Sequence, residues 1–556
     1  LYVREGNVWK YKQVNNIESL ALSSEELYLL PYNKPGIAKM DSLGGLEWML
    51  EDEQYYALEK DGDSYWLGSS ENGLIHYTPN SETRETYYPD GPSSNFAYKL
   101  RFFGDKLYML PGGRWANQLK RLGEVMIFEN DTWRNIKNSR LLEMATNVLG
   151  EKHQVLDLMN VAQDPKDANH YFVTSYGTGM YEFMGDSIVA VHLPDNSELM
   201  SAVLKNPKFY TRTDALQYDD MGNLWLLNMS GEDSRNVHVI TPNGDWSAYN
   251  IYYEQQIVPM HTAGDLLIDN RNSEWKWIPL LRANTGLILL DDNNTPTNPN
   301  DDHATYRNEW IDQNNNQILP TAIYTIAQDH DGVLWVGTQS GIFVIPSNVD
   351  FATSNACRRI IIPRNDGTNL GDYLLNNEQI NEIKIDGANR IWVGTATSGV
   401  FLLKPVEDDV NNPNYYVETV AHFTTENSIL PSNEILSIAI QESTGEVFIG
   451  TGGGLVSYMS DATTPQEDYS KAYVYPNPVT PMYQGYITFK ELVSDTELRI
   501  LDPNGNLVRI IHSEGGSAVW DGKNSSGNRV GSGVYTVLCN TRNGEQSGII
   551  KVMILN

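Results

Sequence analysis

The chain has 556 residues and carries 40 Lys and Arg against 71 Asp and Glu, a formal net charge of −31. This acidic balance argues against binding to nucleic acid, whose phosphates need clusters of basic side chains, and solubility is its simplest meaning. One hydrophobic core does not support this length, so we expect two or three domains. No apolar run reaches the length of a membrane-spanning helix. Two cysteines, Cys357 and Cys539, make neither a disulfide framework nor a metal set.

Residues 1–94 carry three copies of a short β unit. They read LYVREGNVWKY from Leu1, ELYLLPYNKPGIAKM from Glu26 and SYWLGSSENGLIHYTP from Ser64. Such a unit cannot bury its apolar face without a neighbour, and radial stacking of four-stranded units makes a propeller. Three copies cannot close a ring. We therefore predict that residues 1–94 are the last blades of a first β-propeller, and that the chain begins at a processed or truncated start.

Residues 95–460 carry seven further copies, each of about 50 residues, the usual size of a blade. The clearest are LWVGTQSGIF, IWVGTATSGVF and VFIGTGGGLV, whose aromatic positions are 57 and 56 residues apart. Their repeat signature, to which we assign a structural role, consists of Trp335, Gly337, Trp392, Gly394, Phe448 and Gly450. A constant period filled with short strands is typical of repeat architectures. It predicts a second, seven-bladed β-propeller and an all-β fold.

Three segments interrupt this rhythm. Residues 141–150, LLEMATNVLG, are expected to form one short helix. Residues 291–302, DDNNTPTNPNDD, lack the ligand order of a calcium loop, so we expect a solvated loop. Arg114 and Trp115 follow a Pro-Gly-Gly turn and are a candidate ligand pair on a propeller face, although a packing pair at a blade edge is the preferred explanation.

The repeat stops at Asp461. Residues 461–470, DATTPQEDYS, are short and polar and indicate a linker. Residues 471–556 contain six strand candidates, divided by turns such as DPNGN, DGKNSSGN and RNGEQ. This spacing predicts a small, Ig-like β-sandwich.

No catalytic constellation is found in the sequence. It lacks a G-x-S-x-G elbow, an H-E-x-x-H pair, a phosphate-binding glycine loop and a paired-cysteine motif. The histidines are scattered, and His330 and His422 are expected to be structural. We predict no catalytic, cofactor-binding or metal-binding residue and no enzymatic activity. Carboxylates from distant blades could still meet at a propeller face, so missing motifs are weak evidence on this point.

Both halves of the chain resemble known bacterial modules. The W-V-G-T units are similar to the regulator-type propeller repeats in periplasmic sensor regions of hybrid two-component systems. The last domain resembles the C-terminal signal domain of the type IX secretion system. The residues that carry the second resemblance are Tyr475, Pro476, Asn477 and Pro478, then Gly531, Gly533, Val534 and Tyr535, with the terminal strand 551–554. Propeller repeats followed by this domain resemble the PorZ-like family of type IX surface components.

This resemblance implies a non-enzymatic scaffold on the cell surface, exported through the periplasm and associated with the outer membrane. It implies work beside a PorU-like sortase and PorV-like and PorQ-like outer-membrane proteins, and binding of anionic lipopolysaccharide for cargo anchoring. The alternative is a secreted cargo protein with a glycan-binding or polysaccharide-degrading propeller, whose C-terminal domain the sortase removes. A sensor ectodomain is disfavoured, because we would expect it to continue into a membrane helix and a kinase.

Overall fold

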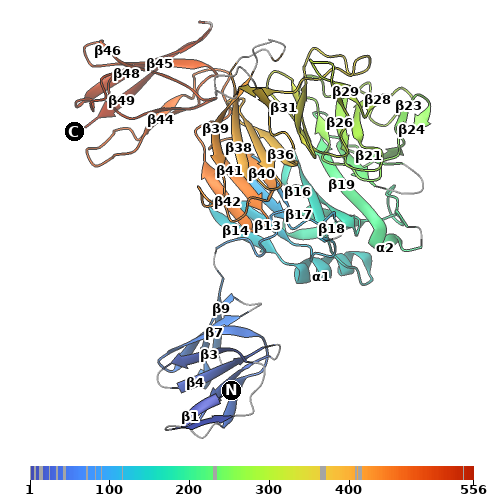
Figure 1. The fold of residues 1–556 in the computed structure, drawn as a ribbon, viewed down its shortest axis with the longest axis vertical. Coiled ribbons are helices and arrows are strands. Elements are labelled where there is room, and N and C mark those ends of the chain that lie inside the picture. The colour runs from blue at the N-terminus through green and yellow to red at the C-terminus, as the bar shows by residue number, and fades with distance from the viewer. Residues whose placement is uncertain are drawn as a thin grey trace. The chain divides into compact units, whose positions relative to one another are not determined.

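The structure is a computed structural model. It describes residues 2–5, 8–11, 17–23, 26–32, 35–41, 45–69, 73–81, 83–88, 90–115, 117–203, 205–229, 235–363, 371–406, 410, 416–542 and 544–555. Two compact units are present, Leu1–Gly91 and Pro92–Asn556, and each is described by itself (Figure 1).

The first unit consists of two antiparallel four-stranded sheets and a hairpin. Their strands are β3 (Ile17–Ser23), β4 (Glu26–Pro31), β5 (Ile37–Met40) and β6 (Leu46–Leu50), then β7 (Tyr55–Asp61), β8 (Ser64–Ser69), β9 (Gly73–Thr78) and β10 (Thr83–Tyr87), with the hairpin β1 (Tyr2–Glu5) and β2 (Val8–Tyr11). A short 3-10 turn spans Pro79–Ser81. Tyr28, Leu30, Tyr55 and Leu67 are buried in one core between the two sheets. Two sheets packed face to face in this way are what neighbouring propeller blades require.

The second unit begins with three sheets that follow one another along the chain. They are β11 (Lys99–Phe103), β12 (Lys106–Leu110), β13 (Val125–Glu129) and β14 (Thr132–Ile136); β15 (Leu158–Asp164), β16 (Asp167–Gly177), β17 (Met180–Met184) and β18 (Ser187–His192); and β19 (Thr211–Tyr218), β20 (Leu224–Asn228), β21 (Val237–Ile240) and β22 (Trp246–Tyr249). A short pairing of β16 with β19 joins the last two sheets.

Four more sheets complete the propeller region. They are β25 (Leu267–Ile268), β26 (Trp275–Leu280), β27 (Gly286–Asp291) and β28 (His303–Arg307); β31 (Ile323–Gln328), β32 (Leu334–Thr338) and β33 (Gly341–Ile345); β36 (Ile380–Ile385), β37 (Ile391–Thr395), β38 (Val400–Pro405) and β39 (Val417–Phe423); and β40 (Ile435–Gln441), β41 (Glu446–Thr451) and β42 (Gly454–Met459). Small hairpins lie between them, formed by β23 (Tyr252–Tyr253) with β24 (Gln256–Ile257), β29 (Trp310–Ile311) with β30 (Gln317–Ile318), and β34 (Ile361–Pro363) with β35 (Gly371–Tyr373).

The signature glycines explain how neighbouring sheets approach. A Cβ atom on Gly337 would lie 2.8 Å from Ile380 Cγ2, at the start of β36. A Cβ on Gly394 would lie 2.6 Å from Ile435 Cγ2, at the start of β40. Only a residue without a side chain leaves room for the next inner strand at this distance. The glycine of each W-V-G-T unit therefore leaves the space into which the first strand of the following sheet packs.

The third signature glycine joins the last sheet of the propeller to the first. A Cβ on Gly450 would lie 2.4 Å from the carbonyl oxygen of Ala97, just before β11. Phe448 on β41 packs at 5.5 Å, centroid to centroid, against Phe102 on β11, and Figure 1 shows β13 and β14 beside β41 and β42. The sheets therefore return on themselves, as in a propeller. The number of blades stays a prediction.

The signature tryptophans are fixed by carboxylates of the preceding turns. The indole N–H of Trp335 donates to Asp329 Oδ2 at 2.9 Å, and that of Trp392 donates to Asp386 Oδ2 at 3.1 Å. Asp329 Oδ1 also accepts the backbone N–H of Val333 at 2.9 Å. The buried Asp329 thus bonds both the backbone of its turn and the indole of Trp335. These bonds hold the tryptophan ring in place, so the motif stabilises the blade.

Residues 138–149 form the longer helix of the unit. The predicted helix at 141–150 is confirmed as α1 (Asn138–Leu149), which buries Leu141, Met144 and Ala145 and ends at Gly150 with a φ of 70°. Gly is the usual residue in this left-handed position. A second, single-turn helix, α2, spans Pro207–Tyr210.

The C-terminal domain is a sandwich of two sheets. One contains β43 (Tyr473–Tyr475), β44 (Ile487–Lys490) and β47 (Ala518–Trp520), and the other β46 (Leu507–His512), β45 (Thr496–Leu501), β48 (Gly533–Thr541) and β49 (Ser547–Ile554). The core between them includes Phe489, Leu498, Trp520, Val537 and Val552. The six expected strands are present, together with β47, which was not among the strand candidates. The all-β prediction, with propeller blades followed by a sandwich, is confirmed.

Candidate functional site

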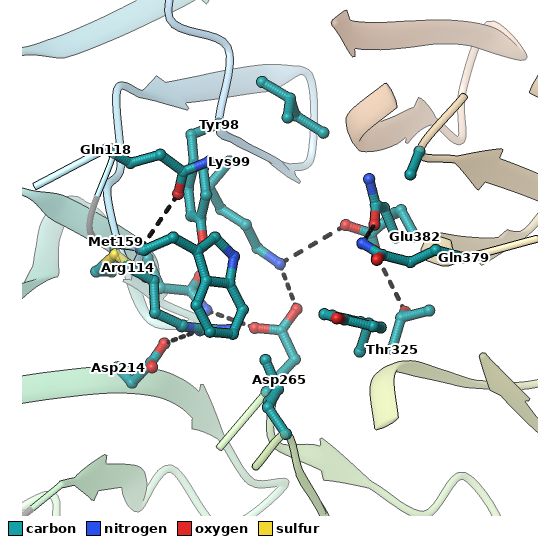
Figure 2. A pocket seen from close by; sticks show the side chains of 18 of the residues that line it. Tyr98, Lys99, Arg114, Gln118, Met159, Asp214, Asp265, Thr325, Gln379 and Glu382 are labelled. Carbon is teal, nitrogen blue, oxygen red and sulfur yellow. Dashed lines mark hydrogen bonds and ion pairs between the residues drawn. The ribbon is translucent and has the colours of Figure 1, made fainter. Parts of the chain in front are cut away.

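A cavity of about 230 Å³ lies among the innermost strands of the second unit (Figure 2). Its lining includes one polar side chain from each of several such strands, namely Lys99 on β11, Asn160 on β15, Asp214 on β19, Thr325 on β31 and Glu382 on β36. These strands converge in the fold although they are far apart in the sequence. The propeller therefore assembles a polar site that no local motif encodes.

Arg114 and Asp214 form an ion pair in the floor of this cavity. Arg114 Nη2 lies 2.6 Å from Asp214 Oδ1, and the two side chains are 11% and 3% exposed. Burial raises the pKa of Asp214 to about 6, although the adjacent guanidinium favours the ionised form. Arg114 Nε and Asp214 Oδ2 are buried and have no hydrogen-bond partner in the part of the chain that the structure describes. The pair therefore retains one unused donor and one unused acceptor.

A second charged group surrounds Lys99. Its ammonium contacts Asp265 and lies 3.9 Å from Glu382 Oε2, and Asn160 Nδ2 donates to Asp265 Oδ1 at 2.7 Å. Burial opposes ionisation of Asp265, but the charges of Lys99 and Arg101 outweigh it and hold the pKa of this carboxyl below its usual range. Both lining cations, Lys99 and Arg114, are thus neutralised by carboxylates of the protein.

Aromatic and amide side chains also line the cavity. Trp115 meets Tyr324 edge to face with 6.4 Å between ring centroids, and the Arg282 guanidinium lies 5.1 Å from the Trp115 centroid. Gln118 and Gln379 also line the cavity and are labelled in Figure 2. This part of the lining therefore combines an aromatic ring, over which a guanidinium already lies, with hydrogen-bonding amides.

The structure brings Arg114 and Trp115 into the same cavity but gives each a different partner. Arg114 bonds Asp214, whereas the Trp115 ring faces Arg282. Sequence analysis missed the partners Lys99, Asp214, Asp265 and Glu382. The available signal is weak: a carboxylate among other polar residues of an inner strand, as in TRTDALQY and INEIKI. Only the assembled propeller shows that these positions converge.

A backbone junction joins the sandwich to the propeller. The Asp461 carboxylate forms an ion pair with Arg390 Nη1 at 2.8 Å. The carbonyl oxygen of Thr463 accepts a hydrogen bond from the N–H of Gly516 at 2.7 Å. Thr464 N–H donates to Glu442 O at 3.1 Å. A Cβ on Gly387 would lie 2.1 Å from Thr463 O. The start of the predicted linker, 461–470, is therefore clamped between a blade turn and the sandwich.

The terminal strand of the C-terminal domain is bonded along its edge by the Tyr-Pro-Asn-Pro motif. Asn477 Nδ2 donates to Lys551 O at 3.0 Å, and Asn477 Oδ1 accepts the N–H of Met553 at 3.0 Å. Val479 N–H donates to Met553 O at 2.8 Å. The motif thus supplies to the edge of β49 the bonds that a neighbouring strand would supply. Tyr475, the last residue of β43, is 47% exposed, and Pro478 separates Asn477 from Val479.

The Gly531, Gly533, Val534 and Tyr535 motif lies at the start of β48. Gly533 pairs with Ile554, and Val534 pairs with Met553. Tyr535 OH donates to Gly531 O at 2.9 Å, and its ring lies 5.8 Å from the Trp520 ring. The two motifs, separated by more than fifty residues, therefore contact the same terminal strand.

The structure gives the remaining polar residues structural partners. His422 stacks on Phe401 at 3.9 Å and bonds Ser398 O at 2.7 Å. Asp292, in the loop expected to be solvated, is instead buried and lies 2.7 Å from the buried Lys276 ammonium. Among the described residues, no group of three or more His, Cys, Asp or Glu could hold a metal ion. Within those residues, too, no helix combines the length and apolarity needed to cross a membrane.

Comparison with known proteins supports the two modules. The family model of the FlgD Ig-like domain matches residues 482–545, and that of the two component regulator propeller matches residues 317–340. No curated protein matches the sequence. The solved structure of PorZ, an essential surface component of the type-IX secretion system of Porphyromonas gingivalis, is 24% identical with a TM-score of 0.71. It covers 97% of this chain and 70% of that one.

A weaker likeness is to the extracellular domain of the putative hybrid two component system BT3049 from B. thetaiotaomicron. That domain is 12% identical with a TM-score of 0.32, over 100% of this chain and 87% of its own length. The chain therefore has the fold of PorZ, with propeller blades and an Ig-like C-terminal domain.

Proposed function

We propose that this protein is a non-enzymatic surface component of a type IX secretion machinery whose C-terminal domain is retained as a working part. The observation that carries the proposal is the junction between the propeller and the sandwich. Thr463 and Thr464 bond the sandwich on one side and a blade turn on the other. Together with the PorZ fold over nearly the whole chain, this supports a permanent two-module body.

The junction bears directly on cleavage of the signal domain. Proteases cut exposed, locally unfolded segments. Residues 461–466 instead donate and accept backbone bonds on both sides, including Gln466 N–H to Leu492 O at 2.8 Å. Lys404 reinforces the contact through Glu514 at 2.8 Å. A sortase would have to open this junction before it reached the beginning of the linker.

The proposed partners are a PorU-like sortase and PorV-like and PorQ-like outer-membrane proteins, met at the cell surface. The proposal also includes binding of anionic lipopolysaccharide for cargo anchoring. Because the net charge is −31, such binding requires a local basic surface, and we expect it to weaken as salt is added.

Cleaved cargo with a glycan-directed propeller is the second candidate, and the cavity at Trp115 is the observation that favours it. Intact mass of the protein taken from the cell surface separates the two. A chain retained through Asn556, with no glycolipid attached and with the sortase co-purifying, supports the machinery component. A chain that ends between Asp461 and Tyr473, joined to lipopolysaccharide, would overturn it.

A further inference from the structure

We infer that the cavity lined by Arg114, Trp115 and Asp214 binds one neutral saccharide unit. The inference does not depend on the secretion role, because it rests only on the chemistry of the lining. The ring of Trp115 would face the apolar side of the sugar, and amides and carboxylates would bond its hydroxyl groups.

The size of the cavity limits the ligand. At about 230 Å³ it falls below the range of about 300–1,000 Å³ that is typical of drug-sized ligands. One ring-sized unit fits this space, whereas a longer chain must extend beyond the cavity.

The charges of the lining argue against an anionic ligand. Four carboxylates line the cavity, on Asp214, Asp265, Glu382 and Glu434, against two cations, Lys99 and Arg114. Both cations already contact carboxylates of the protein. A phosphate or uronate would have to displace one of these partners, and breaking a buried pair is costly. A neutral ligand leaves both pairs intact.

The polar groups suit hydroxyls in particular. A sugar hydroxyl donates one hydrogen bond and accepts others, as a serine hydroxyl does. The amides of Gln118 and Gln379 line the cavity, and each offers both a donor and an acceptor. Asn117, Asn160 and Asn381 add further amides to the lining. Hydroxyl pairs of one ring match such alternating groups, whereas an apolar ligand would leave them all unpaired.

The test is saturation-transfer difference NMR on the full chain with millimolar mannose, rhamnose, galactose and N-acetylglucosamine, and with galacturonate and mannose 1-phosphate as anionic counterparts. We expect transfer to at least one neutral sugar. Trp115→Ala and Gln118→Ala should each weaken that binding, Trp115→Ala by about tenfold or more. Trp246→Ala, which removes a partly exposed ring on β22 outside the cavity lining, is the matched control and should bind as the unaltered chain does.

Each outcome decides the inference. No transfer to any neutral sugar overturns it, as does binding of the anionic sugars alone, or binding that survives both cavity variants while their melting temperatures are unchanged. The source of the sugar is distinguished by adding lipid-free surface polysaccharide and free mannan oligosaccharides. Competition by the polysaccharide alone identifies a neutral segment of the cell's own surface, and competition by mannan alone identifies an external glycan.

Discussion

Gly387→Ala should detach the sandwich from the propeller without unfolding either. Gly387 lies in the turn between β36 and β37, and its φ is not in the left-handed region. An added methyl group therefore causes no backbone strain of its own. Its carbon would lie 2.1 Å from Thr463 O and 2.3 Å from Thr463 C. Backbone atoms cannot rotate out of the way as a flexible side chain can.

The size of the effect follows from the bonds that must open. Nonbonded atoms prefer separations of about 3.5–4.0 Å, so Thr463 has to move by roughly 1 Å or more. That displacement breaks the 2.7 Å bond from Gly516 N–H and the 3.1 Å bond from Thr464 N–H to Glu442 O. Each contributes about 0.5–1.5 kcal/mol. A total of about 1–3 kcal/mol raises the population of the detached state about 5- to 150-fold.

Hydrogen exchange at the amides of Gly516 and Thr464 measures this population directly. The exchange rate of these two amides should rise about 5- to 150-fold in Gly387→Ala. The protease Glu-C should also cleave the variant faster after Glu467. Gly531→Ala is the matched control, because its added Cβ meets nothing within 4 Å and its φ is also unstrained. If Gly387→Ala exchanges at the rate of Gly531→Ala, the junction does not depend on the backbone contact and our reasoning is wrong.

Three further outcomes are expected. His170 bonds Asp164 and Glu182, and these carboxylates raise its pKa above 6.5, although burial opposes the charged form. The two bonds of protonated His170 therefore stabilise the fold fully below pH 6.5. This stabilisation is lost as the pH rises through the folded-state pKa. As the pH is raised from 6.5 through this titration, the melting temperature of His170→Gln should therefore fall less than that of the unaltered chain. Equal slopes would refute the assignment. Trp335→Phe removes the N–H that bonds the buried Asp329 and should cost about 1–3 kcal/mol in denaturant titration; a loss near zero would mean that water replaces the indole. Asn477→Ala should increase hydrogen exchange in β49 while leaving β45 unchanged, and protection that persists in β49 would show that the side-chain cap is dispensable.

Much of the fold could be predicted from the sequence, because local patterns carry it. Each repeat unit contains its own strands, its own turn and the glycine on which the next sheet packs. A constant spacing of Trp335, Trp392 and Phe448 was therefore sufficient to indicate blades. The sandwich was indicated by its turn residues in the same way. The strand at Ala518–Trp520 was missed because it has only three residues and is followed by an Asp-Gly pair that resembles a turn.

The site could be predicted only in part. Arg114 and Trp115 follow a conspicuous Pro-Gly-Gly turn, which drew attention to them. Asp214 and Glu382 have no such mark, since each lies in a strand that contains several other polar residues. Their meeting depends on how the sheets are arranged around the axis, and no short stretch of sequence records that arrangement. The clamp on Thr463 was likewise invisible, because it is made by backbone atoms.

The glycines at the contacts between successive sheets have an evolutionary consequence. Gly337 and Gly394 admit the inner strand of the following sheet, and Gly450 admits Ala97 before the first sheet, through the same kind of close approach. The contact between the last sheet and the first is thus made in the same way as these two contacts between successive sheets. Gene duplication or loss of one repeat would create no surface that lacks a matching partner. A lineage of such chains could change its number of repeats by recombination alone, and polar residues on the inner strands would then be free to diverge toward new ligands.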